Sequence, residues 1–248
     1  MIIIKSPQEI ALMRQAGRVV AAVLQRLREE VKPGIKTRYL DAIAMKEVAK
    51  YGAKASFKGY RGFPAHLCVS VNDEIVHGIP GEREIEDGDI VSLDFGAMVN
   101  GFHGDAAITV GVGKISPQAE ELIAVTQTAL MVGIKAARAG AHIGDISVAI
   151  QSYAEGKGFS VVREYSGHGI GRSLHEDPLV PNYGSPGEGH LLQKGMSLAV
   201  EPMVTAGDWR TRLASNRWTV LTADGSLAAH FEHTIAITDD EAEILTLV

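Results

Sequence analysis

The chain has a single cysteine, Cys68, among its 248 residues. One thiol cannot form an intrachain disulfide, and it cannot build a zinc site that needs several cysteines. This usage is typical of a reducing compartment, so we predict a cytoplasmic protein. Any metal site in the chain must therefore use carboxylates and imidazoles.

Basic clusters and long hydrophobic runs are also scarce. The formal net charge is -6, and no Lys/Arg cluster is present that would neutralise nucleic-acid phosphates or anionic lipid. No run of about 18 apolar residues could span a bilayer, and the apolar stretch at Ile2–Ile4 is too short for a signal-peptide core. Hydrophobic residues make up 46% and charged residues 22%, which favours a globular chain that folds over its whole length.

A helix start lies at Ser6-Pro7-Gln8-Glu9, with Ser as N-cap, Pro at the first helical position and Glu placed to close a capping box. Apolar residues follow at helical spacing until Pro33-Gly34. A second helix is predicted from Thr37 as N-cap to Gly52. Strand-like stretches come next, over residues 66–71, 90–99 and 105–112.

The same signals return in the second half of the chain. Ser116-Pro117-Gln118 repeats the first helix start 110 positions on. Gly88 precedes Asp94 by six residues, as Gly195 precedes Glu201, at an offset of 107. The second half carries about twenty extra residues around Trp218.

Two copies of a helix, helix, strand unit predict a duplicated α/β sandwich, with helices on one side of a curved, mostly antiparallel sheet. We predict one domain over residues 1–248, with an internal pseudo-repeat at about 6–113 and 116–240. Matched strands of the two halves would then face each other across a pseudo-twofold axis.

Three acids interrupt apolar, strand-like stretches: Asp94, Glu201 and Glu232. Alternation could turn each one to solvent. If they point inward, each ionised group costs several kcal/mol unless a cation compensates it. The stretches that carry the acids contain no Lys or Arg, over residues 84–113, 195–209 and 218–248. Divalent metal ions would compensate them, and the alternative is long-range pairing with Arg61, Arg163 or Arg172.

Three histidines lie in segments that could serve such a site: His77 before Gly78, His168 between two glycines, and His175 seven residues later. A lone histidine is more often a surface residue or a satisfied core residue than a ligand. Glycines on both sides of His168 allow close backbone approach, as a site loop requires.

Four of these side chains, together with Asp105, resemble the dinuclear metal site of type I methionine aminopeptidases, in bacterial members without an N-terminal extension. They occur in the family's order, as Asp94, Asp105, His168, Glu201 and Glu232. His77 and His175 match the family's two substrate-contacting histidines. The similarity covers nearly the whole chain, including residues 69–80, 100–105, 166–171, 200–202 and 231–234.

The resemblance implies the pita-bread fold of the M24 metallopeptidases and two divalent ions, which could be Co, Mn, Fe or Zn. It implies that Asp105 and Glu232 bridge the two ions and that Asp94 binds one of them in bidentate fashion. His168 and Glu201 complete the coordination of the other ion.

The implied activity is removal of the N-terminal methionine from nascent proteins whose second residue is small, by attack of a metal-activated water. Glu201 would accept the water proton and pass it to the leaving amine. His175 would stabilise the oxyanion, and His77 would hold the peptide. The family also implies a monomer, which could contact the ribosome transiently.

The methionine pocket implied by the family is lined by Tyr60, Phe63, Cys68 and Trp218, with Phe57 and Leu174 nearby. Each aromatic taken alone is equally typical of core packing. Bacterial members often have Cys at the position of Phe57 and Phe at that of Leu174, and Arg217 also departs from the family pattern. Ala228-Ala229-His230 departs from the usual segment as well.

Three other functions are open. Proline-specific (Xaa-Pro) peptidases of the same fold share the five ligands but usually carry an additional N-terminal domain, whereas the first repeat here starts at Ser6. A non-catalytic pita-bread binding protein would lack ligands that this chain has. A Cys68 nucleophile with His66 lacks an evident third group to orient the imidazole.

Overall fold

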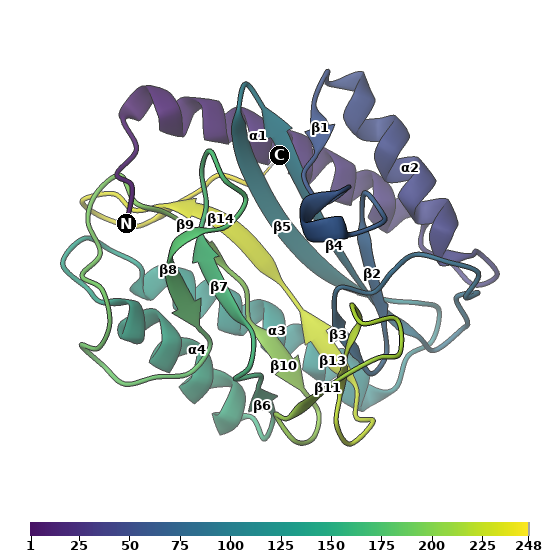
Figure 1. Ribbon diagram of the computed structural model, residues 1–248. Coiled ribbons are helices and arrows are strands. Elements are labelled where there is room, and N and C mark those ends of the chain that lie inside the picture. The colour runs from purple at the N-terminus through teal and green to yellow at the C-terminus, as the bar shows by residue number, and fades with distance from the viewer. Residues whose placement is uncertain (248) are drawn as a thin grey trace.

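In the computed structural model, which describes residues 1–247, four long helices pack against a nine-stranded sheet (Figure 1). The helices are α1 (Pro7–Glu30), α2 (Thr37–Lys50), α3 (Pro117–Ala136) and α4 (Ile143–Gly156). A short 3-10 turn, η1 (Tyr60–Gly62), follows the first helix pair. None of the helices in the described residues is long and apolar enough to cross a membrane.

The first helix begins where the sequence predicts. The Ser6 side chain accepts a hydrogen bond from the Glu9 N–H at 3.3 Å, and the Glu9 carboxylate accepts one from the Ser6 N–H at 3.0 Å. This is the reciprocal capping box, and it satisfies two backbone donors that a helix start leaves free. The Ser116 side chain likewise accepts from the Ala119 N–H at 3.2 Å, which confirms the second Ser-Pro helix start.

The predicted start of the second helix is wrong by one residue. Lys36 is the N-cap of α2, and its side chain makes no capping bond. Thr37 is instead a buried first residue whose hydroxyl accepts from the Gly81 N–H at 2.8 Å and donates to the Gly81 carbonyl at 3.2 Å. A tertiary contact therefore uses the hydroxyl that the sequence assigned to capping. The helix ends at Lys50, and Gly52 follows with φ 64.

The main sheet follows the order β1-β4-β5-β14-β9-β7-β8, with β2 on β4 and β15 on β14. All of its recorded strand pairs are antiparallel, as predicted. Its strands are β1 (Lys54–Ala55), β2 (Cys68–Val71), β4 (Ile90–Val99), β5 (Phe102–Gly111), β7 (Ser166–Gly169), β8 (Glu176–Pro181), β9 (Ser197–Val200), β14 (Glu232–Ala236) and β15 (Glu243–Ile244).

Two smaller sheets flank the main one. The first has the order β13-β10-β6, and the second has the order β11-β12-β3. Their strands are β3 (Glu74–Val76), β6 (Ser160–Val161), β10 (Met203–Thr205), β11 (Thr211–Leu213), β12 (Val220–Thr222) and β13 (Ala228–His230). The residues around Trp218 that are extra in the second half of the sequence therefore form the β11–β12 hairpin.

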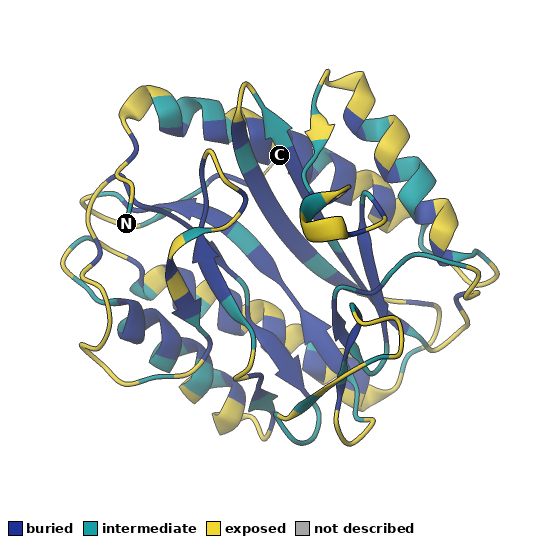
Figure 2. Ribbon diagram, viewed as in Figure 1, coloured by how far each residue is buried: buried dark blue, intermediate teal, exposed yellow. Residues whose placement is uncertain are grey.

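Each helix pair covers its own hydrophobic cluster against the sheet (Figure 2). Helix α1 packs on β4 and β5, where Val20, Leu24 and Leu27 are buried with Leu93. Helices α3 and α4 pack on each other and on the strands of the second half. Burial of these helix faces stabilises a rigid central sheet, and its remaining side chains are free to build a site.

Candidate metal centre and substrate pocket

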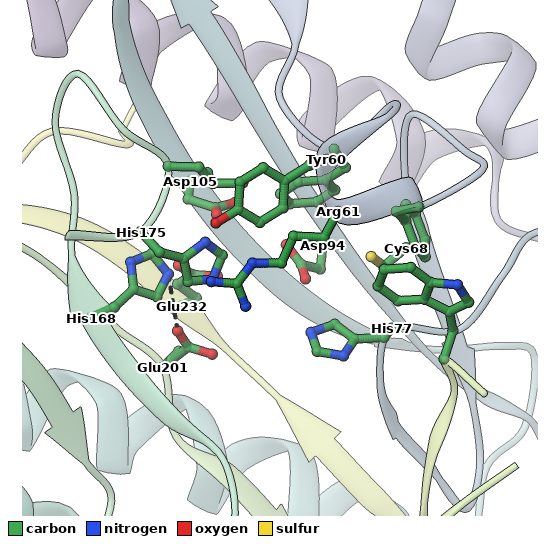
Figure 3. A pocket seen from close by; sticks show the side chains of 14 residues that line it. Tyr60, Arg61, Cys68, His77, Asp94, Asp105, His168, His175, Glu201 and Glu232 are labelled. Atoms are coloured by element: carbon green, nitrogen blue, oxygen red, sulfur yellow. Dashed lines mark ion pairs between the residues drawn. The ribbon is translucent and has the colours of Figure 1, made fainter.

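Five neighbouring strands bring the five predicted ligands together. Strands β4, β5, β14, β9 and β7 are adjacent in that order in the main sheet. One ligand comes from each strand in the same order: Asp94 on β4, Asp105 on β5, Glu232 on β14, Glu201 directly after β9, and His168 on β7. All five line one pocket (Figure 3).

The strand register explains why the acids converge. Ala107 is paired with Asp94 on one side and with Glu232 on the other, so these three residues form one row across the sheet. Side chains in such a row point to the same face. Asp105 is two positions from Ala107 along the strand and shares that face. The small side chain of Ala107 leaves the space between the two acids open.

Burial raises the pKa of every carboxyl in this cluster. The pKa of Asp94 rises from 3.8 to about 7 because the group is removed from water. Burial also raises the pKa of Asp105, Glu201 and Glu232 well above their ordinary values, and the neighbouring carboxylates add to the effect. Four acids held this closely favour their charged forms only when a cation is present.

No arginine from elsewhere supplies that cation within residues 1–247. Arg163 pairs with Glu155 at 3.6 Å, and Arg172 pairs with Glu9 at 3.2 Å. Arg61 lies over the Tyr60 ring, and the structure records no ion pair for it. Long-range pairing of the acids with arginine is therefore excluded for the described residues.

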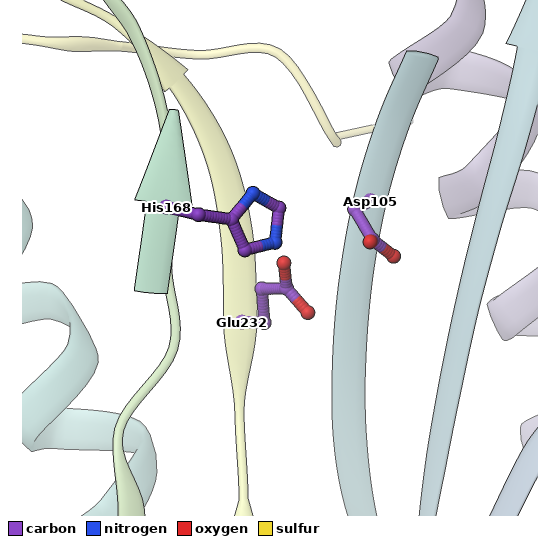
Figure 4. A group of neighbouring side chains, drawn as sticks. All are labelled: Asp105, His168 and Glu232. Atoms are coloured by element: carbon purple, nitrogen blue, oxygen red, sulfur yellow. The ribbon is translucent and has the colours of Figure 1, made fainter. Parts of the chain in front are cut away.

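The donor atoms of the cluster fit divalent metal ions. One carboxylate oxygen on each of Asp94, Asp105 and Glu232 is buried with no hydrogen-bond partner in the described chain. Ligand atoms of Asp105, His168 and Glu232 all lie within 4.8 Å of one another (Figure 4). Oxygen donors with one imidazole are a set that Mn, Fe, Co and Zn accept.

His168 presents a lone pair to this cluster. Its Nδ1 lies 2.8 Å from the Gly169 carbonyl oxygen, so Nδ1 donates and Nε2 is left as an acceptor. Nε2 is 3.5 Å from Oε1 of Glu201, the contact drawn as a dashed line in Figure 3. Burial lowers the pKa of His168 to about 4, which keeps the ring neutral.

The two other predicted histidines line the same pocket. The His175 ring stacks on Tyr60, with ring centroids 5.2 Å apart and planes 12° apart, and it lies 4.0 Å from the His168 ring. His77 follows β3 with φ 59. Next to it, Gly78 packs so closely that an added Cβ would lie 2.0 Å from the Val69 carbonyl oxygen.

The predicted methionine pocket also gathers here. The remaining walls are Phe57, Tyr60, Phe63, Cys68, Leu174 and Trp218. Phe63 meets Trp218 edge to face at 5.2 Å. Cys68 is paired in register with Asp94, so the apolar walls adjoin the acid cluster directly. An apolar slot beside a polar cluster is typical of a small-molecule or side-chain binding site.

The structure opposes a nucleophilic role for Cys68. Asp41 does orient His66, with Oδ2 3.2 Å from its Nδ1, which the sequence alone did not indicate. However, burial and the neighbouring carboxylates raise the pKa of the Cys68 thiol well above its ordinary value. A nucleophilic cysteine needs the opposite shift.

Two residues at the site were not predicted there: Arg61 was considered only as a long-range counter-charge for the acids, and His230 only as part of a segment that departs from the family pattern. Arg61 lines the pocket, and its guanidinium extends across the opening between His175 and His77 (Figure 3). His230 lies 3.7 Å from Glu201, and burial lowers its pKa to about 3. The available signal for His230 was its position two residues before Glu232, which a single continuous strand would place on the same face, although in the structure the two residues belong to β13 and β14.

Comparison with known proteins gives a consistent result. The family model described as "Metallopeptidase family M24" matches residues 11–239 of this chain. A methionine aminopeptidase of Clostridium perfringens is 54% identical, with 100% of both chains covered. The crystal structure of a Thermotoga maritima methionine aminopeptidase is 48% identical, with TM-score 0.99 and 100% of both chains covered. An Xaa-Pro dipeptidase of Bacillus anthracis is 25% identical with TM-score 0.79, over 98% of this chain and 61% of that one.

Proposed function

This chain belongs to metallopeptidase family M24, with the pita-bread fold, and we propose that it removes N-terminal methionine from new polypeptides at the metal centre described above. It is a hydrolase with the activity of its methionine aminopeptidase relatives. We propose that residues 1–248 act as one catalytic domain. In support, the family match runs without interruption over residues 11–239, and the ligands come from both halves of the chain.

One observation carries the assignment of the site. The buried carboxyls of Asp105 and Glu232, the partly buried ones of Asp94 and Glu201 and the imidazole of His168 come from five adjacent strands, and no Lys or Arg in the described residues pairs with them. Two divalent ions (Co, Mn, Fe or Zn) would neutralise this cluster. Asp105 and Glu232 would each be shared by the two ions, and Asp94 would bind one of them. His168 and Glu201 would complete the coordination of the other ion.

Bound dications would supply Lewis-acid chemistry, by polarising the scissile carbonyl and making water a stronger acid. Glu201 takes a proton from the attacking water and delivers it to the leaving amine. His175 donates to the oxygen of the carbonyl under attack, and its stacking on Tyr60 holds the ring in place. His77 holds the peptide beyond the bond that is cut.

The methionine side chain binds among Tyr60, Phe63, Cys68 and Trp218. The preference for a small second residue is the one that the resemblance implies, and His77 and His175 both line the pocket beside the ligands. The partners are nascent polypeptides, with transient ribosome contact. We propose that the protein is cytoplasmic, since new chains with an N-terminal methionine are made in the cytoplasm. We also propose that it is a monomer.

A proline-specific peptidase of the same fold is the second candidate. Against it, identity to the Xaa-Pro dipeptidase is 25%, about half of the 48% and 54% found for the two methionine aminopeptidases. A non-catalytic protein of this fold is not favoured, because all five ligand positions are present and converge.

A peptidase assay on Met-Ala-Ser, Met-Lys-Ser and Gly-Pro-Ala tests the function, with Mn²⁺ or Co²⁺ added and with chelator. Cleavage of Met-Ala-Ser only, abolished by chelator, is expected. Release of glycine from Gly-Pro-Ala would move the assignment to the proline-specific enzymes. Turnover that resists chelator would refute the metal mechanism.

A further inference from the structure

His230 is a buried imidazole at the metal centre for which the five-ligand set has no role. It is the last residue of β13, its exposed fraction is 1%, and its Nε2 lies 3.7 Å from Oε2 of Glu201. Neither of its ring nitrogens has a hydrogen-bond partner within residues 1–247. Buried polar atoms without partners are rare, so this arrangement calls for a function.

Glu201 lies between two imidazoles, one facing each carboxylate oxygen. Its Oε1 is 3.5 Å from Nε2 of His168, and its Oε2 is 3.7 Å from Nε2 of His230. The two rings differ at the other nitrogen. Nδ1 of His168 donates to the Gly169 carbonyl at 2.8 Å, which leaves its Nε2 lone pair for a metal ion. Nδ1 of His230 has no acceptor in the described chain.

The missing acceptor decides where the proton of His230 resides. A neutral imidazole carries one N–H, on either nitrogen. A proton on Nδ1 would be a buried donor with nothing to receive it, which is costly. A proton on Nε2 faces a carboxylate oxygen instead. We propose that His230 is a positioning residue whose Nε2–H donates to Oε2 of Glu201 and turns Oε1 toward His168 and the metal ions.

The bond forms with a small movement. An N–H···O bond spans about 2.9 Å, so the present 3.7 Å must close by roughly 0.8 Å. Oε2 keeps a second lone pair after accepting from His230. Glu201 can therefore be held by His230 and still take the proton from water. This inference rests on the proposed function, since it concerns how Glu201 is held during that reaction.

NMR identifies directly which ring nitrogen of His230 carries the proton. Long-range ¹H–¹⁵N correlation on zinc-loaded, ¹⁵N-histidine-labelled protein distinguishes Nδ1–H, Nε2–H and metal-bound nitrogen, and the His230→Gln variant assigns the signal. The expected result is Nε2–H for His230 and Nδ1–H with a metal-bound Nε2 for His168. A proton on Nδ1 of His230, or a metal-bound Nε2, would overturn the proposal.

Substitutions of His230 test whether its hydrogen bond to Glu201 matters for turnover and metal binding. His230→Leu fills the space without a donor, whereas His230→Gln keeps an N–H that can reach Glu201. We expect His230→Leu to lose about 10- to 100-fold in kcat on Met-Ala-Ser and in Mn²⁺ affinity by titration calorimetry, with KM within about threefold. His230→Gln should keep most of the kcat and most of the Mn²⁺ affinity of the parent protein. His233→Gln changes a partly buried histidine of β14 that alternates with Glu232 and so points to the opposite face. It is the control and should match the parent in kcat and Mn²⁺ affinity.

The outcomes separate the two proposals. If the parent protein releases methionine but a folded His230→Leu variant equals it in kcat and Mn²⁺ affinity, the positioning role is refuted and the function stands. If the parent protein binds no Mn²⁺ or releases no methionine, the proposed function fails and this inference fails with it. Should His230→Leu not fold, the proton assignment and the His230→Gln variant decide.

Discussion

Lys5 and Glu176 form a buried ion pair that joins the N-terminal segment to the loop carrying His175. The Lys5 Nζ lies 2.6 Å from Oε2 of Glu176, and the two side chains are 3% and 6% exposed. Oε1 of the same carboxylate accepts the Ser173 N–H at 3.1 Å. The pair therefore holds both ends of the short segment in which His175 lies.

Lys5→Met should lower the free energy of unfolding by about 3 to 5 kcal/mol, because it leaves the Glu176 carboxylate buried without a cationic partner. Urea unfolding of the metal-loaded protein measures this. Arg172→Ala, which breaks the exposed pair with Glu9, is the control and should cost less than about 1 kcal/mol. Adding Glu176→Gln to Lys5→Met should restore part of the loss, and failure to do so would argue against the pair.

In the metal-free protein, the stability that Asp94 contributes should be lost as the pH rises from about 4 to about 7. The folded pKa of Asp94, about 7, lies above its ordinary value of 3.8, so the folded state binds more protons in this window. The stabilising contribution of Asp94 is complete below about pH 4 and is lost as the pH rises through 7. Asp105, Glu201 and Glu232 shift in the same direction.

Urea unfolding in chelator at several pH values, for the parent and for Asp94→Asn, checks this prediction. The parent should weaken relative to Asp94→Asn as the pH rises. Mn²⁺ should reverse the trend, because metal ions bind deprotonated carboxylates and stabilise the folded state more at higher pH. Parallel curves for the two proteins would contradict the assignment of the shift to Asp94.

The Tyr60 ring should matter for turnover, and its hydroxyl should not. The ring stacks on His175 at 5.2 Å, and aromatic pairs contribute about 0.5 to 1.5 kcal/mol. Tyr60→Leu should therefore lower kcat/KM on Met-Ala-Ser by about 3- to 10-fold, whereas Tyr60→Phe should stay near the parent value. Equal losses in both variants would assign the effect to the hydroxyl instead.

Gly17 allows the C-terminal segment to pack on α1. A Cβ at this position would lie 2.1 Å from the Leu245 carbonyl oxygen, so Gly17→Ala should destabilise the protein by about 1 to 3 kcal/mol. Gly156, at the end of α4, has nothing within 4 Å of an added Cβ, and Gly156→Ala should stabilise by up to about 1 kcal/mol. Thermal unfolding of both variants tests the contrast, and a stable Gly17→Ala protein would refute the close approach.

Much of the fold could be predicted locally. The Ser6 capping box, the matching Ser116 start and the strand over residues 90–99 are all present, because caps and alternation act within a few residues. Thr37 was misassigned because its hydroxyl bonds to Gly81, a partner 44 positions away. Strand limits also shifted: the predicted 66–71 begins at Cys68, and 105–112 became Phe102–Gly111.

The sequence predicted which residues belong to the candidate site but not how they are arranged in space. The five candidate ligands were predicted by resemblance and by the scarcity of local Lys and Arg near the acids, and all five line one pocket. Their adjacency depends on the register that pairs Ala107 with both Asp94 and Glu232. The β4–β5 half of that register is a hairpin, but the half that pairs Ala107 with Glu232 joins positions more than a hundred residues apart, so no local pattern encodes it. The places of Arg61 and His230 at the site were not predicted from the sequence either.

The sequence by itself determined which side chains would need a counter-charge if buried: Asp94, Glu201 and Glu232 lie in apolar, strand-like stretches with no basic residue nearby. Only the tertiary structure decided how these acids are arranged so that they can share a cation. Hydrogen bonding between strands sets the order β4, β5, β14, β9 and β7 and brings the acids and His168 to one pocket, and the pairing of β13 with β10 sets His230 against Glu201.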